Sequence, residues 1–402
     1  MQLNLEKRSH ERILLLILAA VQFAHITDFM MLMPLGARLL EQLNITPTQF
    51  GILVSSYTFS AGIAGFAGAF FLDRIGRKLA ISVAQAGFTL GTLLCALSTD
   101  YETFLVMRII TGIFGGMQSA LLLAIIGDVI PFDRRGAAMG LVMAAFSIAA
   151  VLGVPAGLYL ANKFDWHFPF FCLAAFGGVV SIVIFIVLPS LKGHLQKGPG
   201  QRPWQMLKEN LSDKNKVMAL LLISFIMLGF FPILPYITPY LEQNVGIAAD
   251  DIPYIYLLGG ALTIFTSRII GGLADRYGKK QVLTACTLIT AIPVYLLTNL
   301  WPTTLFVVLC ITGILFIAAN GRFVTVMSLI TSVASMQTRG SYMSLNSAVQ
   351  QFAAALASFI GGLLVSQGAD QKLSGFAEAG YLAIVFVIPI IVVAWRIKPV
   401  DD

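Results

Sequence analysis

The stretch Phe71-Leu-Asp-Arg-Ile-Gly-Arg-Lys78 recurs later in the chain as Leu273-Ala-Asp-Arg-Tyr-Gly-Lys-Lys280. In both copies a long apolar run precedes the charged turn and another apolar run follows it. A chain that repeats one charged turn at half its length has arisen by duplication. The repeat therefore predicts two related halves, each with this turn between two membrane-spanning segments.

The composition indicates that the solvent of this chain is a lipid bilayer. Of its 402 residues, 57% are apolar and 11% are charged, whereas soluble domains carry about 25% charged residues. A spanning helix needs about 20 mostly apolar residues. We count twelve such segments, at roughly 13–40, 50–72, 79–98, 102–130, 136–162, 167–189, 216–241, 251–273, 280–298, 302–333, 340–367 and 376–396.

The Lys and Arg residues predict the orientation of these segments. With the N-terminus inside, 20 of the 26 Lys and Arg residues fall in inner segments, which is the bias of cytoplasmic loops. Both termini should then be cytoplasmic, and the net charge of +6 needs no nucleic-acid partner. We expect one six-helix bundle over 1–189, a cytoplasmic linker over 190–215, and a second bundle over 216–402. The linker suits either a helix on the membrane surface or a plain tether.

Other matches extend the repeat beyond the charged turn. Pro34 corresponds to Pro235, and Thr111-Gly112 corresponds to Thr312-Gly313. Six spans in each half make the halves parallel, related by an axis along the membrane normal. The predicted fold class is an all-α membrane protein of twelve transmembrane helices in two six-helix, pseudo-symmetric bundles.

These residues resemble the major facilitator superfamily. Its hallmark is the turn Asp73-Arg-Ile-Gly-Arg-Lys78, and its fourth helix carries an Arg followed by spaced glycines, as do Arg108, Gly112 and Gly116. A third feature, the stretch Gly153-Val-Pro-Ala-Gly157, resembles the arabinose-efflux-permease-like members of the drug:proton antiporter branch. The resemblance implies a twelve-helix fold, a cavity lined by helices 1, 4, 7 and 10, and export.

Three charges are expected to lie deep inside the bilayer: Asp28, Arg108 and Arg322. A charge near the bilayer centre costs at least about 2.5–3.5 kcal/mol, which marks it as functional. Unlike the charged turn, none of the three has a charged counterpart in the other half. Asp28 and Arg108 lie at similar depths and are predicted to pair, and His25 shares the helical face of Asp28.

We assign proton coupling to Asp28, His25 and Arg108, because a carboxylate and an imidazole in one cavity can exchange a proton. A purely structural ion pair and a packing role for His25 are the alternatives. Arg322 suits either contact with an anionic substrate or static bracing. The remaining candidates for the substrate cavity are the neutral polar residues Gln118, Asn320, Tyr236 and Gln350, for which helix-to-helix contact is the alternative.

The charged turns and their neighbours are predicted to form the gate on the cytoplasmic side. Asp128 lies near the inner end of its helix and is expected to accept hydrogen bonds from Arg77, although a solvated loop charge is the alternative. The gating candidates are Asp73, Arg74, Gly76, Arg77, Lys78, Asp128, Arg135, Asp275, Arg276 and Gly278.

The chain carries no recognisable catalytic or ATP-binding motif. All four cysteines fall in apolar spans without a Cys-x-x-Cys pair, so we expect structural thiols, no metal and no cofactor. The sequence predicts a monomeric secondary transporter of the cell (inner) membrane, exporting a small amphiphilic or polar molecule in exchange for protons. An uptake symporter or uniporter is one alternative, and a non-transporting membrane sensor or scaffold is another.

Overall fold

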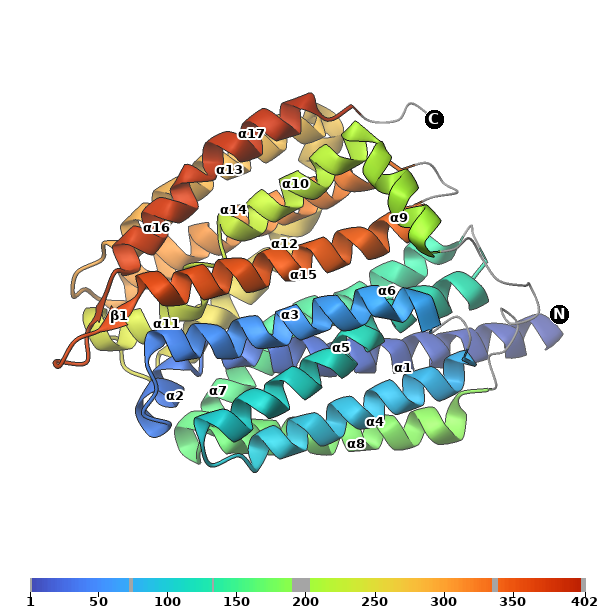
Figure 1. The fold of residues 1–402 in the computed structure, drawn as a ribbon, viewed down its shortest axis with the longest axis horizontal. Helices are drawn as coiled ribbons and strands as arrows, with labels where there is room; N and C mark the ends of the chain where they lie inside the picture. Colours follow the sequence, from blue (N-terminus) through green and yellow to red (C-terminus); the bar gives the residue numbers. More distant parts are fainter. Residues whose placement is uncertain (1, 72–74, 132–133, 190–202, 335–338, 399–402) are drawn as a thin grey trace.

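The computed structural model describes residues 2–71, 75–131, 134–189, 203–334 and 339–398, which are almost entirely helical. Figure 1 shows the long helices running mostly lengthwise through the molecule, with both chain ends on the same side. We call that side the termini end. The opposite side, which carries α2 and β1, is the hairpin end.

The first helix set covers the chain up to residue 189. It consists of α1 (Gln2–Leu32), α2 (Gly36–Gln42), α3 (Pro47–Phe71), α4 (Arg77–Ala96), α5 (Tyr101–Val129), α6 (Arg135–Ile148), the π-helix η3 (Ala149–Gly153), α7 (Val154–Lys163) and α8 (His167–Val187). Asp100 shows how the sequence starts these elements. Its side chain accepts a hydrogen bond from the backbone N–H of Thr103 at 2.9 Å and so caps α5.

The second helix set follows residue 202. It consists of α9 (Pro203–Ser212), α10 (Lys214–Leu228), the 3-10 helix η5 (Leu234–Tyr236), α11 (Ile237–Tyr240), the π-helix η6 (Leu241–Val245), α12 (Ile252–Tyr277), α13 (Lys279–Thr298), α14 (Leu305–Thr331), α15 (Arg339–Leu364), the strands β1 (Ser366–Gln367) and β2 (Leu373–Ser374), α16 (Phe376–Val385) and α17 (Val387–Arg396). The two strands pair antiparallel in a short hairpin. The helix α9 lies within the stretch 190–215 that the sequence predicts as a linker.

Within the described residues, eleven helical segments are long and apolar enough to cross a membrane. The remaining predicted segment, the seventh at 216–241, is broken: α10 stops at Leu228, and turns and short helices follow. Proline removes a helix hydrogen bond and clashes with the preceding turn, and Pro235 lies in this region. Its repeat partner Pro34 lies between α1 and α2. The first long segment of each half is therefore interrupted at a matched position.

Buried apolar side chains form three clusters among the described residues. One contains residues of the first helix set alone, including Leu18 and Ile125. A second contains residues of the second set alone, including Ile223 and Val326. The largest joins both sets and includes α2, η6 and the β-hairpin. The sets thus share one core at the hairpin end and have separate cores elsewhere.

Small residues permit the closest helix contacts. Gly116 of α5 lies directly against the Ala61 carbonyl of α3. Between the two helix sets, Gly51 of α3 lies against Gly362 of α15, where an added Cβ would be 3.0 Å from the Gly362 Cα. Backbones approach this closely only where neither helix carries a side chain.

Candidate functional site

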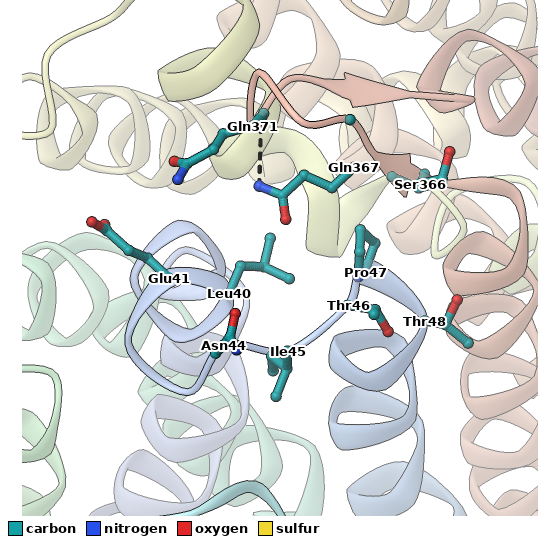
Figure 2. Close-up of a pocket in the computed structure, with 12 residues that line it drawn as sticks. Leu40, Glu41, Asn44, Ile45, Thr46, Pro47, Thr48, Ser366, Gln367 and Gln371 are labelled. Atoms are coloured by element: carbon teal, nitrogen blue, oxygen red, sulfur yellow. Dashed lines mark hydrogen bonds between the residues drawn. The ribbon is translucent and has the colours of Figure 1, made fainter.

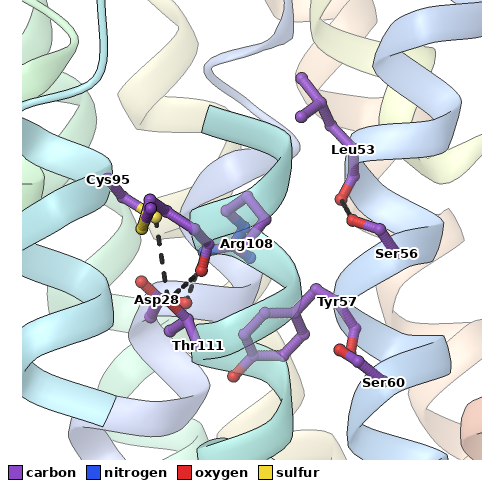
Figure 3. A network of polar contacts seen from close by, with 9 residues as sticks. Asp28, Leu53, Ser56, Tyr57, Ser60, Cys95, Arg108 and Thr111 are labelled. Atoms are coloured by element: carbon purple, nitrogen blue, oxygen red, sulfur yellow. Dashed lines mark hydrogen bonds and ion pairs between the residues drawn. The ribbon is translucent and has the colours of Figure 1, made fainter. Parts of the chain in front are cut away.

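The structure pairs Asp28 with Arg108 inside the first helix set (Figure 3). Arg108 Nη1 donates to Asp28 Oδ2 at 2.6 Å, and both side chains are fully buried. Asp28 lies near the hairpin end of α1, and Arg108 lies two turns into α5. The Arg108 guanidinium also covers the ring of Tyr57 on α3, 4.4 Å from its centroid. Three helices therefore converge on one buried ion pair.

This ion pair leaves several polar atoms without partners. Asp28 Oδ1 and Arg108 Nε and Nη2 are buried and have no partner at full hydrogen-bond geometry among the described residues, although the side chains of Thr92 and Cys95 lie close enough to act on the pair. A buried polar atom left unpaired costs about 1–3 kcal/mol. A pair kept only for stability would normally satisfy these atoms, so this arrangement suits a group that changes partners.

His25 lies one turn before Asp28 on α1, as the sequence spacing predicts. Its imidazole is buried between Tyr57 and Phe88, with ring centroids 6.1 Å from each. Neither of its ring nitrogens has a hydrogen-bond partner in the part of the chain that the structure describes. Gly115 of α5 gives the imidazole room, because an added Cβ there would be 2.8 Å from His25 Cδ2.

The two glycines of the Gly153-Val-Pro-Ala-Gly157 motif contact α1 on both sides of Asp28. Gly153 ends η3, and an added Cβ would lie 2.6 Å from the Thr27 hydroxyl oxygen. One turn later, Gly157 of α7 lies directly against Met31. The π-helix over 149–153 interrupts regular helix at this contact, a feature that is frequent at functional sites. The motif therefore sets the position of the α1 segment that carries Asp28.

Arg322 is the buried cation of the second helix set. It lies on α14, is 2% exposed, and has its guanidinium carbon 5.9 Å from the ring centroid of Phe230. Phe230 belongs to the break after α10. No carboxylate of the described residues forms an ion pair with Arg322, and its Nε makes no hydrogen bond.

The four neutral polar candidates do not converge on one place. Gln118 donates to Gln85 Oε1 of α4 at 2.9 Å, and Asn320 donates to Ser267 Oγ of α12 at 2.7 Å. These are the helix-to-helix contacts that the sequence leaves as the alternative. The Tyr236 hydroxyl donates to the Pro47 carbonyl at 2.9 Å and so links the two helix sets. Gln350 is half-buried on α15.

At the termini end, the first charged turn contacts α5. Arg77 Nε donates to Asp128 Oδ2 at 2.8 Å, the contact that the sequence predicts. Gly76 precedes the first residue of α4, and Lys78 lies 5.8 Å from the ring centroid of Phe185. The guanidinium of Arg135 donates to the carbonyls of Ile130 and Gly127 at the end of α5. Asp73 and Arg74 lie outside the described residues.

The second charged turn is arranged differently. Asp275 and Arg276 are exposed at the end of α12, and the Arg276 guanidinium lies 5.2 Å from the ring centroid of Tyr277. Gly278 adopts a φ of 98° between α12 and α13, which favours glycine. Lys279 Nζ donates to the Ser328 carbonyl at 3.2 Å. The role of both turns in gating stays a prediction.

Sequence reasoning missed a polar link between the helix sets at the hairpin end. Arg38 Nη2 donates to Asn162 Oδ1 at 2.7 Å, and Asn162 Nδ2 donates to the Ala249 carbonyl at 2.7 Å. Nearby, burial raises the pKa of Glu242 to about 7, with Arg38 lowering it and Glu41 adding to the rise. The sequence places Arg38 on the outer side, but no spacing in the sequence indicates its partner.

A pocket of 440 Å³ lies close to this link (Figure 2). Its lining combines the end of α2, including Glu41, and the α2–α3 connection, including Thr46, with the β-hairpin. Gln367 Nε2 donates to the Gln371 carbonyl at 3.0 Å across its upper wall. None of the candidate site residues predicted from the sequence lines this pocket.

A bundle of apolar helices with buried charges and broken first helices is the architecture of a secondary transporter. The comparison with family models agrees: the model described as Major Facilitator Superfamily matches residues 18–268 and 219–402. The chain therefore belongs to the major facilitator superfamily. It is a multi-pass membrane transporter and not an enzyme.

Similar proteins include the uncharacterized MFS-type transporter YtbD of Bacillus subtilis, 26% identical over 87% of this chain and 88% of that protein. The inner membrane transport protein YdhP of Escherichia coli is 26% identical over 62% of this chain and 63% of its own length. Among solved structures, a D-xylose-proton symporter has a TM-score of 0.75 at 16% identity, covering 97% of this chain and 98% of that chain. At that identity the likeness concerns the fold.

Proposed function

We propose that this transporter exports a small amphiphilic or polar molecule in exchange for protons. The observation that carries the proposal is the buried pair of Asp28 and Arg108. The imidazole of His25 lies one turn away and makes no hydrogen bond to any residue that the structure describes. Protonation of Asp28 would cancel its charge and weaken its bond to Arg108. Once Asp28 is protonated, Arg108 is free to make different interactions in the two access states. Coupling requires such a difference between the states.

The proposed domains are the two helix sets, a bundle over 1–189 and a bundle over 216–402, joined by a cytoplasmic linker over 190–215. The shared core at the hairpin end and the separate cores elsewhere support rocking of one bundle against the other. In this proposal the protein works as a monomer. The hairpin end faces outward, both termini are cytoplasmic, and the cell (inner) membrane is the site of action, as for the inner membrane transport protein YdhP.

The proposed direction of transport rests on the Gly153-Val-Pro-Ala-Gly157 motif. Gly153 and Gly157 contact α1 beside Asp28, so the segment that resembles efflux proteins shapes the surroundings of the proposed proton site. An uptake symporter or a uniporter is the competing function. A sensor or scaffold without flux is less favoured, because unsatisfied buried charges are costly to retain without a ligand or proton to serve.

Reconstitution in liposomes tests the proposal. The wild-type protein should move substrate out of the compartment that its cytoplasmic side faces when a pH difference is imposed. The Asp28→Asn protein mimics the protonated form, so it should lose this driven transport and keep substrate exchange at equal pH. Driven accumulation by Asp28→Asn would remove Asp28 from the coupling role. Movement of substrate together with protons would replace export by uptake.

A further inference from the structure

Arg322 differs from the other buried arginines of the described chain. Arg108 pairs with Asp28, and Arg77 pairs with Asp128. Arg322 is as deeply buried, at 2% exposure, but it has no carboxylate partner among the described residues, and its buried Nε makes no hydrogen bond there. Taking one ion out of water costs several kcal/mol unless a counter-charge or hydrogen bonds repay it. No charge among the described residues offsets this cost for Arg322.

A brace is the obvious alternative, and this chain shows what a bracing arginine looks like. The guanidinium of Arg135 donates hydrogen bonds to two backbone carbonyls at the end of α5. Arg322 instead faces an aromatic ring, Phe230, and the thiol of Cys286 on α13 lies within electrostatic reach. Neither of these supplies a negative charge at neutral pH. The surroundings hold the guanidinium in place without neutralising it.

The position of Arg322 also suits a ligand site. It lies 17 residues after the first residue of α14, about 26 Å along a helix of about 40 Å, and its side chain points back toward the helix start. This places the guanidinium near mid-depth. Phe230 sits where the seventh segment loses regular helix, and broken helices near the midplane commonly form substrate sites.

We propose that Arg322 binds the carboxylate of an organic monoanion, whose apolar body packs against Phe230. A planar guanidinium matches a carboxylate with two parallel hydrogen bonds, and the aromatic wall favours an apolar body over a small inorganic ion. The inference rests on the proposed transport function, for which it names the substrate class. It assigns the anion to the second helix set, while the proton is assigned to the first.

The test measures thermal unfolding of the purified full-length protein at pH 7.5 or so, where benzoate is anionic. Benzoate and benzenesulfonate should raise the unfolding temperature of the wild type, whereas benzamide and benzylamine should not, because bound ligand stabilises by mass action. Arg322→Met should abolish the effect. Arg322→Lys keeps the charge and should weaken benzoate binding by about tenfold, the loss expected from one charge-assisted hydrogen bond.

A second measurement, made without ligand, separates a binding group from a brace. Arg322→Met removes an unpaired charge and should raise the unfolding temperature, while the matched change Arg108→Met strands Asp28 and should lower it. The inference fails if Arg322→Met is destabilised as Arg108→Met is. It also fails if neither anion stabilises the wild type more than Arg322→Met. These are binding and stability readouts, so a failure of proton-coupled export in liposomes leaves them standing.

Discussion

At the scale of single residues, buried charged side chains are the feature that most affects the stability and the proposed function of this protein. The ion pair of Asp28 and Arg108 is stable because each charge neutralises the other at 2.6 Å, and removal of one partner from a buried pair costs about 3–5 kcal/mol. Glu242 at the hairpin end shows the same physics in a milder form. It is half-buried, and Glu41 and Arg38 act on it from α2 with opposite signs.

Glu242 should make the stability of the hairpin end depend on pH. Folding raises its pKa from 4.5 to about 7, so its stabilising contribution is complete below pH 4.5 and is lost as pH rises through 7. Glu242→Gln cannot lose a proton and should lack this decline. The unfolding temperature of both proteins, followed from pH 5 to pH 8 or so, checks this. Parallel curves for the two proteins would contradict it.

At the scale of elements, breaks and glycines position the site. Pro34 and Pro235 interrupt the first long segment of each half at matched positions. The π-helix η3 and Gly153 bring the fifth segment against Thr27, the residue before Asp28. Helix geometry in the bilayer is otherwise regular, because lipid offers no partners for free backbone groups. The departures from regular helix therefore point to the segments that carry function.

Gly153→Ala should impair transport while leaving the protein folded. The added methyl group would lie 2.6 Å from the Thr27 hydroxyl oxygen, and such overpacking costs about 1–3 kcal/mol. Gly178→Ala on α8 is the matched control, since an added Cβ there meets nothing within 4 Å. Flux of both variants in liposomes is the measurement. Equal flux would show that the contact between η3 and α1 does not shape the site.

At the scale of the whole molecule, the fold joins two helix sets unequally. The hairpin end holds a shared core, the link from Arg38 through Asn162, and the bond from Tyr236 to the Pro47 carbonyl. Away from that end each set has its own core. The core that the two sets share therefore lies toward one side, although α3 and α15 also meet farther from it, where Gly62 lies against Phe352. The distribution of Lys and Arg predicts that the hairpin side faces outward.

Single cysteines should establish the orientation. Lys372 in the hairpin and Ser212 at the end of α9 are both exposed, so each position is open to reagents. In intact cells, an impermeant thiol reagent should label Lys372→Cys and spare Ser212→Cys, in a background without the native cysteines. Permeabilised cells should show labelling at both positions. Labelling of Ser212→Cys alone in intact cells would show that the topology is the reverse of the predicted one.

The sequence by itself determined the helical class, the duplication and the long apolar segments, because a bilayer forces the chain into helices of about 20 apolar residues. It also indicated that Asp28 and Arg108 lie at one depth, since depth follows from counting residues along a helix. The prolines within 216–241 are the sequence signal for the break there, whereas the length of the apolar run predicts one continuous span.

Only the tertiary structure decided which buried groups meet. It pairs Asp28 with Arg108 across 80 positions, leaves Arg322 without a partner among the described residues, and turns Gln118 and Asn320 toward neighbouring helices. The physical reason is rotation about the helix axis. A helix that is apolar on every side carries no amphipathic signal to show which face packs where, so the contacts of its few polar side chains are fixed by packing between distant helices.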